Sequence, residues 1–370
     1  MKIIKWFTLI LIAGSVLIYL ALKVPQVQIG IFSVLGKNSF AQNLKAPRYE
    51  GLTATVCGSG SPLPSDSAQA CIMIQAEDRM FIVDVGDGSV RNLSSWRVPL
   101  EDLKAVLITH LHSDHFSDLA DLHLMSWVAR DRSKKLTVFG PEGIENVTKG
   151  FELAYTYDSL YRNEHHGDII APFDVVGYEP FTLQGDSVIY DENDLKITAF
   201  LVSHKPVDPA YGFRFDYKGR SIVISGDTIY DENLIKYAKK ADLLFHEAIS
   251  YELMRISSRI ASGLGEEYDN NASRYGSEIF GHIEDYHTTP VEAAMAASKS
   301  DVGLLVFYHL IPTPQIPIRT IMAKIFFRGV TEVFPNWEYA IDGTTIILPP
   351  DSDEIISVSY THLRAHETSL

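Results

Sequence analysis

Residues 109–115 read Thr109-His-Leu-His-Ser-Asp-His115 and bring three histidines and one aspartate within six positions of the chain. His110 and His112 alternate, so both side chains point to one side of an extended segment. Asp114 and His115 then fall in what we expect to be a turn into a helix. Imidazoles and a carboxylate at this spacing suit borderline divalent metals, above all zinc. The segment follows an apolar run and precedes an amphipathic one, which disfavours a polar loop that is rich in histidine by chance.

Apolar runs elsewhere in the chain also end in a residue that can bind a metal or transfer a proton. These runs are short and rich in Val, Ile and Phe, which is typical of buried strands. The runs, each with the residues that follow it, are 105–109 with His110, 197–203 with His204, 221–226 with Asp227, 242–245 with His246 and Glu247, and 303–308 with His309. Open α/β sheets bind ligands at the carboxyl ends of their strands, so we expect these endings to meet.

Helical patterns alternate with the strands. One helix is expected over residues 116–130 and a second after Asp231. A third begins at Thr289-Pro-Val-Glu292, where a capping box is combined with proline at the first helical position. Further strands are expected before the alternation, at 52–57, 71–75 and 80–85. This order predicts an α/β fold with two sheets packed face to face and helices outside.

The H-x-H-x-D-H segment resembles the metal-binding motif of the metallo-β-lactamase superfamily, and the resemblance covers roughly residues 50–350. Asp84, in Val-Asp-Val-Gly, resembles the acid that precedes the motif, and His204, Asp227 and His309 resemble the later ligands in their expected order. Three further matches are to the subgroup that contains ribonuclease Z and certain arylsulfatases: Gly58-Ser-Gly60, His246-Glu-Ala248 and His287-Thr-Thr289. The resemblance implies an αββα four-layer sandwich.

The same resemblance implies a centre with two divalent metal ions, above all zinc. One ion would be held by His110, His112 and His204, the other by Asp114, His115 and His309, with Asp227 bridging them. Two metals about 3.5–4 Å apart can stabilise both the attacking and the leaving oxygen. Asp114 would also orient the attacking hydroxide, and Asp84 would accept an N–H from a ligand imidazole.

His287 is the candidate general acid for the leaving group, and Glu247 could support it. Each also has a plainer interpretation, His287 as a helix-capping or surface histidine and Glu247 as half of a structural pair. His123, His165 and His166 are expected to be surface or core residues rather than ligands.

Composition limits the partners. The formal net charge is −15 and we find no cluster of lysine and arginine, Lys134 and Lys135 being the densest pair. An acidic surface repels phosphate backbones, so nucleic acid is an unlikely partner and a small-molecule ester is favoured. No linker interrupts the chain after residue 50, which predicts a single hydrolase domain over residues 48–350. The sequence carries no signal for an oligomeric state.

The first 23 residues are predicted to be a signal-anchor or a signal peptide, followed by a linker over residues 24–47. Lys2 and Lys5 precede an apolar run over residues 6–22. A bilayer span takes roughly 17–25 residues and the apolar part of a signal peptide about 7–15. We therefore favour an uncleaved anchor over a cleaved peptide, with a buried soluble helix as the third alternative. The lysines place this end in the cytoplasm and the domain on the periplasmic or extracellular side.

Cys57 and Cys71 are the only cysteines, too few for a thiolate zinc site. The runs that hold them flank one turn, so the two could pair across neighbouring strands in an oxidising compartment. They could equally remain two buried thiols.

Residues 357–370 have no apolar period and resemble translated sequencing-adapter sequence. We therefore predict that residues 351–370 are a disordered or artefactual tail, and we exclude His362 and His366 from the site.

Together these features predict an exported or membrane-anchored metal-dependent hydrolase of a small phosphodiester, sulfate ester or lactone. Ribonuclease Z carries a protruding arm that grips transfer RNA, whereas here only residues 215–220 lie between Arg214 and Ser221, room for a hairpin turn. Two alternatives stay open. One is a ribonuclease Z-like endoribonuclease that processes the 3′ end of transfer RNA, and the other is a non-catalytic metal-binding envelope protein. An iron-containing redox variant would need an electron-transfer domain, for which we expect no room.

Overall fold

The computed structural model describes residues 2–43, 49–128, 132–268, 271, 275, 278 and 286–359. The chain divides into two units, Met1–Pro47 and Arg48–Leu370. His362 and His366, which the sequence excluded from the site, lie outside the described residues.

The first unit consists of helices α1 (Lys2–Ala21) and α2 (Pro25–Asn43). Among the described residues, neither helix alone is long and apolar enough to cross a bilayer. Trp6–Ala21 and Pro25–Lys37, bent by 87°, meet that requirement as a pair, by length and composition only, and a signal sequence meets it as well. Helix α2 covers most of the segment that we expected to be a linker, and its role as a linker stays a prediction.

The first sheet of the second unit is mixed. Its order is β15-β14-β1-β2-β3-β4-β5-β6. Pairing is antiparallel from β15 to β3 and parallel from β3 to β6. The strands are β1 (Leu52–Gly58), β2 (Cys71–Ala76), β3 (Arg79–Val83), β4 (Leu103–Leu107), β5 (Leu136–Gly140), β6 (Tyr178–Thr182), β14 (Thr344–Leu348) and β15 (Ile356–Ser359).

The second sheet is mixed as well, in the order β13-β12-β11-β10-β9-β8-β7. It is antiparallel from β7 to β10 and parallel from β10 to β13. The strands are β7 (Ser187–Glu192), β8 (Leu195–His204), β9 (Val207–Tyr217), β10 (Arg220–Ile224), β11 (Leu243–Ile249), β12 (Leu304–Ile311) and β13 (Trp337–Tyr339). The central strands β11 and β12 are buried along their whole length, which explains their continuous apolar sequence.

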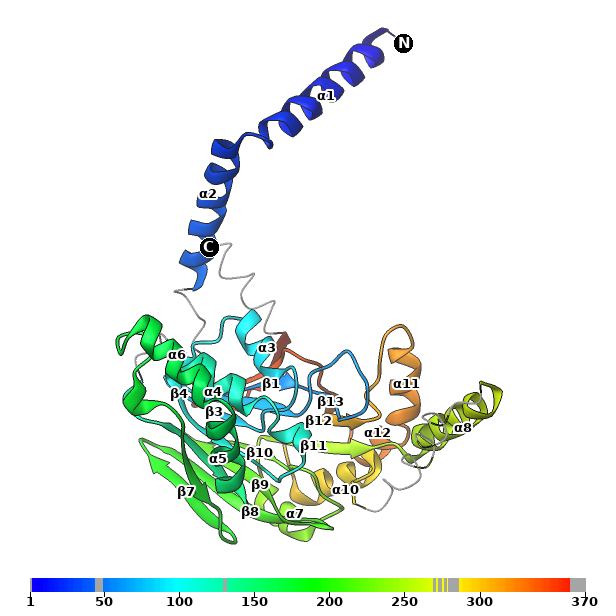
Figure 1. Cartoon of the computed structure of the whole chain (residues 1–370). Helices are drawn as coiled ribbons and strands as arrows, with labels where there is room; N and C mark the ends of the chain where they lie inside the picture. Colours follow the sequence, from blue (N-terminus) through cyan, green and yellow to red (C-terminus); the bar gives the residue numbers. More distant parts are fainter. Residues whose placement is uncertain are drawn as a thin grey trace. The chain divides into compact units, whose positions relative to one another are not determined.

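Helices cover the outer faces of both sheets, so the four-layer sandwich is confirmed (Figure 1). The helices are α3 (Ser89–Ser95), α4 (Leu119–Trp127), α5 (Ile144–Ala154), α6 (Thr156–His166), α7 (Glu232–Ala238), α8 (Tyr251–Glu267), α10 (Pro290–Ser300), α11 (Arg319–Phe326) and α12 (Val330–Val333). One core lies between the sheets, a second under α3, α4 and α5, and a third under α7, α10, α11 and α12.

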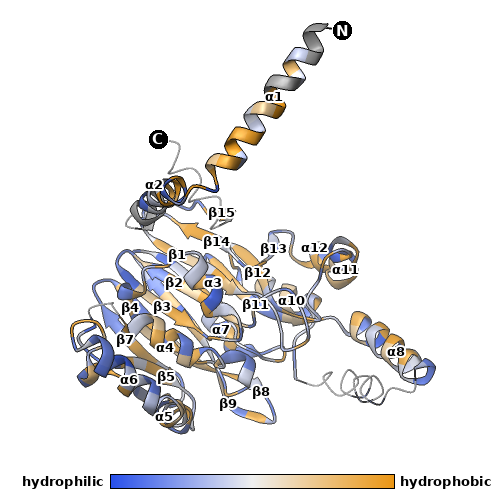
Figure 2. Cartoon of the chain, turned by 45° about the horizontal axis from the view of Figure 1, so that its top comes forward, coloured by the Kyte–Doolittle hydropathy of each residue, from blue (hydrophilic) through white to orange (hydrophobic). Residues whose placement is uncertain are grey.

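Hydrophobic residues gather in the strands, whereas α6 is largely polar (Figure 2). Phe213 and Phe215 of β9 are fully buried between the sheets and Leu244 of β11 is fully buried under the helices. Burial of such a side chain stabilises the fold by about 1.5–3 kcal/mol. The sandwich is therefore a rigid support for the loops at its edge.

Local signals for the helices agree with the structure, with one shift. Thr289 and Glu292 form the capping box of α10, and Asp231 caps α7 by accepting from the backbone N–H groups of Asn233 and Leu234. The helix expected over residues 116–130 begins only at Leu119, because residues 113–115 form a 3₁₀ turn that carries the motif into the site. Residues 129–131 lie outside the described part of the chain.

Strand β15 extends the domain past residue 350, where we had placed its end. It pairs antiparallel with β14 and lies at the edge of the first sheet. Residues 356–359 read Ile-Ser-Val-Ser and alternate as a strand does, but we had set them aside because residues 357–370 resemble adapter sequence. The Arg220 guanidinium also donates to the carbonyls of Pro349 and Glu354, which holds the approach to β15. Residues 360–370 are not among the described residues.

Cys57 and Cys71 form a disulfide between β1 and β2, with their Cα atoms 5.0 Å apart. Of the two alternatives that the sequence left open, the structure has the paired one. The bond closes the base of the loop that joins these two strands.

Candidate metal centre

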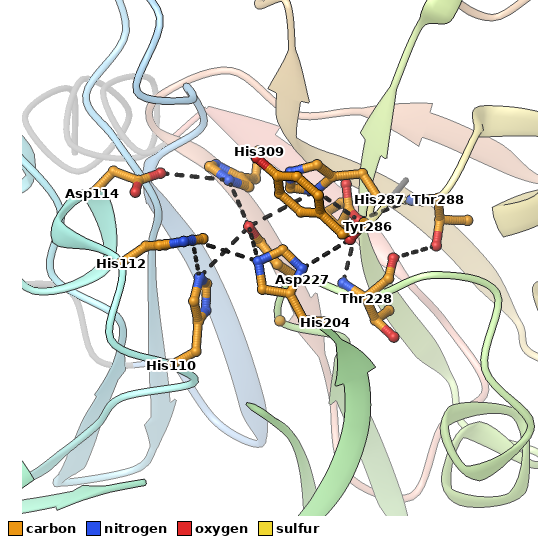
Figure 3. Close-up of polar contacts among 12 residues, drawn as sticks. His110, His112, Asp114, His204, Asp227, Thr228, Tyr286, His287, Thr288 and His309 are labelled. Carbon is orange, nitrogen blue, oxygen red and sulfur yellow. Dashed lines mark hydrogen bonds and ion pairs between the residues drawn. The ribbon is translucent and has the colours of Figure 1, made fainter. Parts of the chain in front are cut away.

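The predicted ligands meet at one edge of the sandwich, where strands from both sheets end (Figure 3). His110 follows β4, His204 ends β8, Asp227 follows β10 and His309 lies within β12. These four side chains are at most 2% exposed. The strand endings that the sequence singled out therefore converge, with the exception of His246, whose ring lies in the core and donates from Nδ1 to the carbonyl of Glu247.

Two glycines allow the loops to approach closely. A Cβ atom on Gly86 would lie 2.1 Å from the carbonyl oxygen of Asp114, and one on Gly226 would lie 2.5 Å from the carbonyl oxygen of Tyr211. Gly226 also has a φ of +61°, a conformation that glycine adopts without a steric penalty. Any larger residue at either position would push Asp114 or Asp227 away from the centre.

His110, His112 and His204 form the first group. His110 Nε2 lies 3.0 Å from His112 Nδ1, which lies 3.4 Å from His204 Nε2. Nitrogen ligands of one tetrahedral zinc ion, at about 2.0–2.1 Å from the metal, are about 3.3 Å apart. The spacing of this group therefore suits a single ion.

Asp114, His115 and His309 form the second group. His115 Nε2 lies 3.5 Å and His309 Nε2 3.7 Å from Asp114 Oδ2. All three side chains are buried. Two imidazoles and a carboxylate oxygen are a donor set that zinc accepts, and they leave room for a further ligand.

Asp227 lies between the two groups. Its Oδ2 is 3.8 Å from both His110 Nε2 and His204 Nε2 on one side, and 3.5 Å from His115 Nε2 and 3.3 Å from His309 Nε2 on the other. A single carboxylate oxygen in this position can contact an ion in each group. The structure thus brings all seven predicted ligands together in two His/Asp clusters, an arrangement consistent with a binuclear centre.

The tautomers of the histidines are set from outside the centre. His115 Nδ1 donates to Asp84, His204 Nδ1 to the carbonyl of Tyr286 and His309 Nδ1 to the carbonyl of Gly60, each at 2.8 Å. The inward Nε2 atoms therefore carry lone pairs. Among the described residues, Nε2 of His115, Nε2 of His309 and Oδ1 of Asp227 have no hydrogen-bond partner although all three are buried, which fits a bound metal.

Asp84 lies behind the first part of the motif. Its carboxylate accepts from Thr109 N at 2.8 Å, from Thr109 Oγ1 and from His115 Nδ1. Because the Thr109 hydroxyl gives its hydrogen to Asp84, the 3.0 Å contact from His110 Nδ1 makes that imidazole a donor as well. Asp84 thus orients two of the histidines, one directly and one through Thr109.

Glu247 holds His287 at the side of the centre. Glu247 is fully buried, and its Oε1 accepts from His287 Nδ1 at 3.2 Å, from Thr288 N at 3.0 Å and from Thr228 N at 3.3 Å. His287 Nδ1 also lies 3.9 Å from Asp227 Oδ2. His287 is therefore neither a surface residue nor the cap of α10, whose cap is Thr289.

Charges within the cluster shift the protonation of its members. Burial raises the pKa of Asp227, but the imidazoles of His309 and His115 outweigh it and hold that pKa well below its usual range. Burial lowers the pKa of His287, but the Glu247 carboxylate outweighs it and raises that pKa. Asp227 therefore stays ionised, which is the form that binds a cation.

A pocket of about 180 Å³ opens on the centre. Its walls include Pro62, Leu63, Tyr286 and Ile311, beside Asp114, His287 and other site residues. Sequence reasoning missed Tyr286, whose carbonyl holds His204 and whose ring lies 5.0 Å from that imidazole. Its position next to the His-Thr-Thr segment was the available signal.

The remaining histidines that we assigned to surface or core lie away from the centre. His123 is buried against Trp127 and accepts from the backbone N–H of Gly177. His165 and His166 are exposed at the end of α6.

Comparisons with known proteins agree with this geometry. The family model for Anti-Pycsar protein Apyc1 matches residues 52–257, more than half of the chain. Ribonuclease Z of Mycolicibacterium gilvum is 31% identical over 269 residues, which is 71% of this chain and 86% of that protein. Ribonuclease Z of Mycobacterium marinum is 32% identical over 261 residues, 70% of this chain and 86% of that protein.

Solved structures share the fold. The metallo-β-lactamase fold protein YhfI from Bacillus subtilis has a TM-score of 0.56 at 20% identity, over 80% of this chain and 99% of its own. The short form of human tRNase Z has a TM-score of 0.54 at 20% identity, with the same two coverages. At this identity the likeness concerns the fold alone. The sequence matches and the His/Asp clusters together show that this chain belongs to the metallo-β-lactamase-fold metal-dependent hydrolases related to ribonuclease Z, within the family that the Apyc1 model describes.

Proposed function

We propose that the chain is a metal-dependent phosphodiesterase. The observation that carries the proposal is the position of Asp227, whose Oδ2 lies within 3.3–3.8 Å of an imidazole nitrogen pair in each cluster. A binuclear centre can bind both the attacking and the leaving oxygen of an in-line displacement. The ribonuclease Z relatives support a phosphodiester among the three ester classes that the sequence suggested, because a ribonuclease breaks phosphodiester bonds. The sulfate ester and the lactone remain expectations from the sequence alone.

The metal ions and the residues around the pocket would have separate roles in this hydrolysis. Two divalent ions, zinc above all, would supply positive charge for the phosphoryl oxygens and a strong nucleophile at neutral pH. Asp114, at the edge of the pocket, accepts a hydrogen bond from the attacking water and orients it. His287, held through Nδ1 by Glu247, lines the pocket, and its other ring nitrogen would donate a proton to the leaving oxygen. Asp84 keeps the tautomer of His115 fixed throughout.

Two substrates of different size fit this chemistry, a small phosphodiester and a precursor transfer RNA. Different observations favour each. The sequence relatives favour the ribonuclease alternative, since 86% of the Mycolicibacterium gilvum enzyme is matched. The charge and the shape of this chain favour a small diester. The formal net charge is −15, and β9 and β10 are joined only by Lys218 and Gly219, where the resemblance to ribonuclease Z had placed an arm. We propose the small diester as the substrate and keep precursor transfer RNA as the second candidate.

Turnover of both substrates by the purified domain tests this choice. We expect hydrolysis of a bis-aryl phosphate, loss of that activity in a chelator and recovery when zinc is added back. We expect no cleavage of precursor transfer RNA at the same enzyme concentration, even at low salt, where electrostatic binding is strongest. Site-specific cutting of a transfer-RNA 3′ trailer under these conditions would establish the ribonuclease alternative. A metal-free protein with full activity would remove the metal centre from the mechanism.

We also infer that the domain is exported and remains attached to the membrane through residues 6–22. The apolar run over these residues supports this, as does the disulfide between Cys57 and Cys71, because disulfides persist in oxidising compartments. Protease added to spheroplasts should digest the domain, whereas a variant that lacks residues 1–23 should stay inside and be protected. Protection of the full chain, or its recovery in the soluble cytoplasmic fraction, would contradict export.

A further inference from the structure

The loop between β1 and β2 connects the metal centre to a residue far away in the sequence. This loop, residues 59–70, is closed at its base by the Cys57–Cys71 disulfide and forms one wall of the pocket through Pro62 and Leu63. The carbonyl of Gly60 accepts from His309 Nδ1 at 2.8 Å. The carbonyl of Ser59 accepts from the N–H of Leu310, the residue after His309, at 3.3 Å. The loop therefore holds both the ring and the backbone at His309.

His309 depends on such support. Its φ is +46°, in the left-handed region that residues other than glycine rarely occupy. A backbone in that region persists only where the surrounding structure holds it. The ring hydrogen bond to Gly60 is also what leaves Nε2 facing Asp227 and Asp114. Displacement of the loop would thus change both the direction and the tautomer of this ligand.

One carboxylate holds both limbs of the loop. Asp342, in the turn before β14, accepts through Oδ1 from Ser59 N at 3.0 Å and from Ser59 Oγ at 2.7 Å. Through Oδ2 it accepts from Ala68 N at 2.8 Å and from Asn92 Nδ2 at 2.9 Å. Asn92 donates a second hydrogen bond to the carbonyl of Cys57, next to the disulfide. All four acceptor positions of the carboxylate are therefore used to fix the loop.

We propose that Asp342 is a positioning residue for His309 and so sets the metal affinity of the cluster formed by Asp114, His115 and His309. The proposal rests on the proposed metal centre. The other cluster takes its orientation from different groups, since His204 donates to Tyr286 and His110 to Thr109. Asp342 therefore acts on one of the two ions and leaves the other unchanged.

The test is a zinc titration of Asp342→Asn in the full chain. An asparagine has one acceptor oxygen, so its NH₂ group faces donors on Ser59 or on Ala68 and Asn92, and the loop loses part of its support. Loss of a group that hydrogen-bonds a ligand directly typically weakens metal binding about 10–100-fold, and Asp342 acts one step further out, through Ser59 and the neighbouring Gly60 carbonyl. With metal-buffered solutions of rising free zinc, the variant should bind one zinc as the unaltered chain does and the second only at about 10-fold higher free zinc, the lower end of that range.

Asp242→Asn is the matched control. Asp242 Oδ2 accepts from Ser221 N at 2.7 Å and from Ser221 Oγ at 3.3 Å, the same pair of donors that Ser59 offers, at the opposite end of β10 from the centre. It should bind both zinc ions with unchanged affinity. Ser59→Ala removes only the hydroxyl, so it should weaken the second zinc in the same direction by a smaller factor, and it carries the test if Asp342→Asn does not fold.

The outcomes separate this proposal from the metal centre itself. If the unaltered chain binds no zinc, the metal centre fails. If it binds two and Asp342→Asn binds both with equal affinity, the role of Asp342 is overturned. Equal weakening of both ions in Asp342→Asn would likewise overturn it, because Asp342 would then serve the fold as a whole. Cobalt in place of zinc gives a second readout, since the absorption spectrum of only one of two cobalt ions should change.

Discussion

Replacement of Asp227 by alanine should abolish hydrolysis and lower the metal content of the purified protein. Its Oδ2 is the atom nearest to both clusters, 3.3 Å from His309 Nε2 and 3.5 Å from His115 Nε2, with His110 and His204 at 3.8 Å. Its removal leaves four buried imidazoles without the carboxylate that links them, and both ions lose a charged ligand. Elemental analysis after dialysis, together with rates on a bis-aryl phosphate, measures both effects.

The control for this substitution is Asp216→Ala. Asp216 pairs with Arg214 on β9 and touches none of the predicted ligands. It should retain metal and activity. Asp227→Asn keeps the shape and removes the charge, so it should fall between alanine and the unaltered chain in metal content. An Asp227→Ala protein that keeps two ions and its full rate would show that the bridging position is wrong.

Replacement of His287 by alanine should slow hydrolysis by about 10²–10⁴-fold, the usual contribution of a positioned acid–base group, and leave the metal content intact. The metal content should stay intact because His287 lies outside both metal clusters, where its Nδ1 is 3.2 Å from Glu247 Oε1. The loss should shrink on diesters with good leaving groups, which need no proton. The ratio of the rates on p-nitrophenyl and alkyl esters therefore reports on the role.

Glu247→Gln should act in the same direction as His287→Ala but less strongly, because an amide still accepts from His287. His166→Ala, at the exposed end of α6, should have no effect. Equal losses on good and poor leaving groups would exclude His287 as the acid and leave it a role in binding.

The metal ligands could be predicted because each belongs to a short pattern of neighbouring residues in the sequence. Each stands at or near the carboxyl end of an apolar strand or in one short motif, and parallel strands bring their carboxyl ends to a common edge. The N-termini of helices α7 and α10, at Asp231 and Thr289, could be predicted equally well. A helix cap is a contact between residues two to three positions apart. Where a feature depends on near neighbours in the chain, the sequence and the structure agree.

The remaining features depend on groups that are far apart in the chain. The carbonyl of Gly60 is 249 positions from His309 and the carboxylate of Asp342 is 283 positions from Ser59. No residue type is required to supply a carbonyl. The motif matches at Gly58-Ser-Gly60 and beside Tyr286 therefore point to these segments without showing which ligand each carbonyl holds. Strand β15 was missed for another reason, because its short Ile-Ser-Val-Ser alternation overlaps the residues that we set aside as an adapter-like tail.

The turn between β9 and β10 lies at the opposite end of β10 from the loop that holds Asp227. Lys218 and Gly219 are exposed, and the five residues of β10, about 17 Å of extended chain, lie between them and the loop that holds Asp227. Each doubling of a flexible loop costs only about 0.6 kcal/mol in closure entropy, so an insertion here would barely disturb the fold. We therefore expect this hairpin tip to accept an inserted segment with no change in the residues of the metal centre.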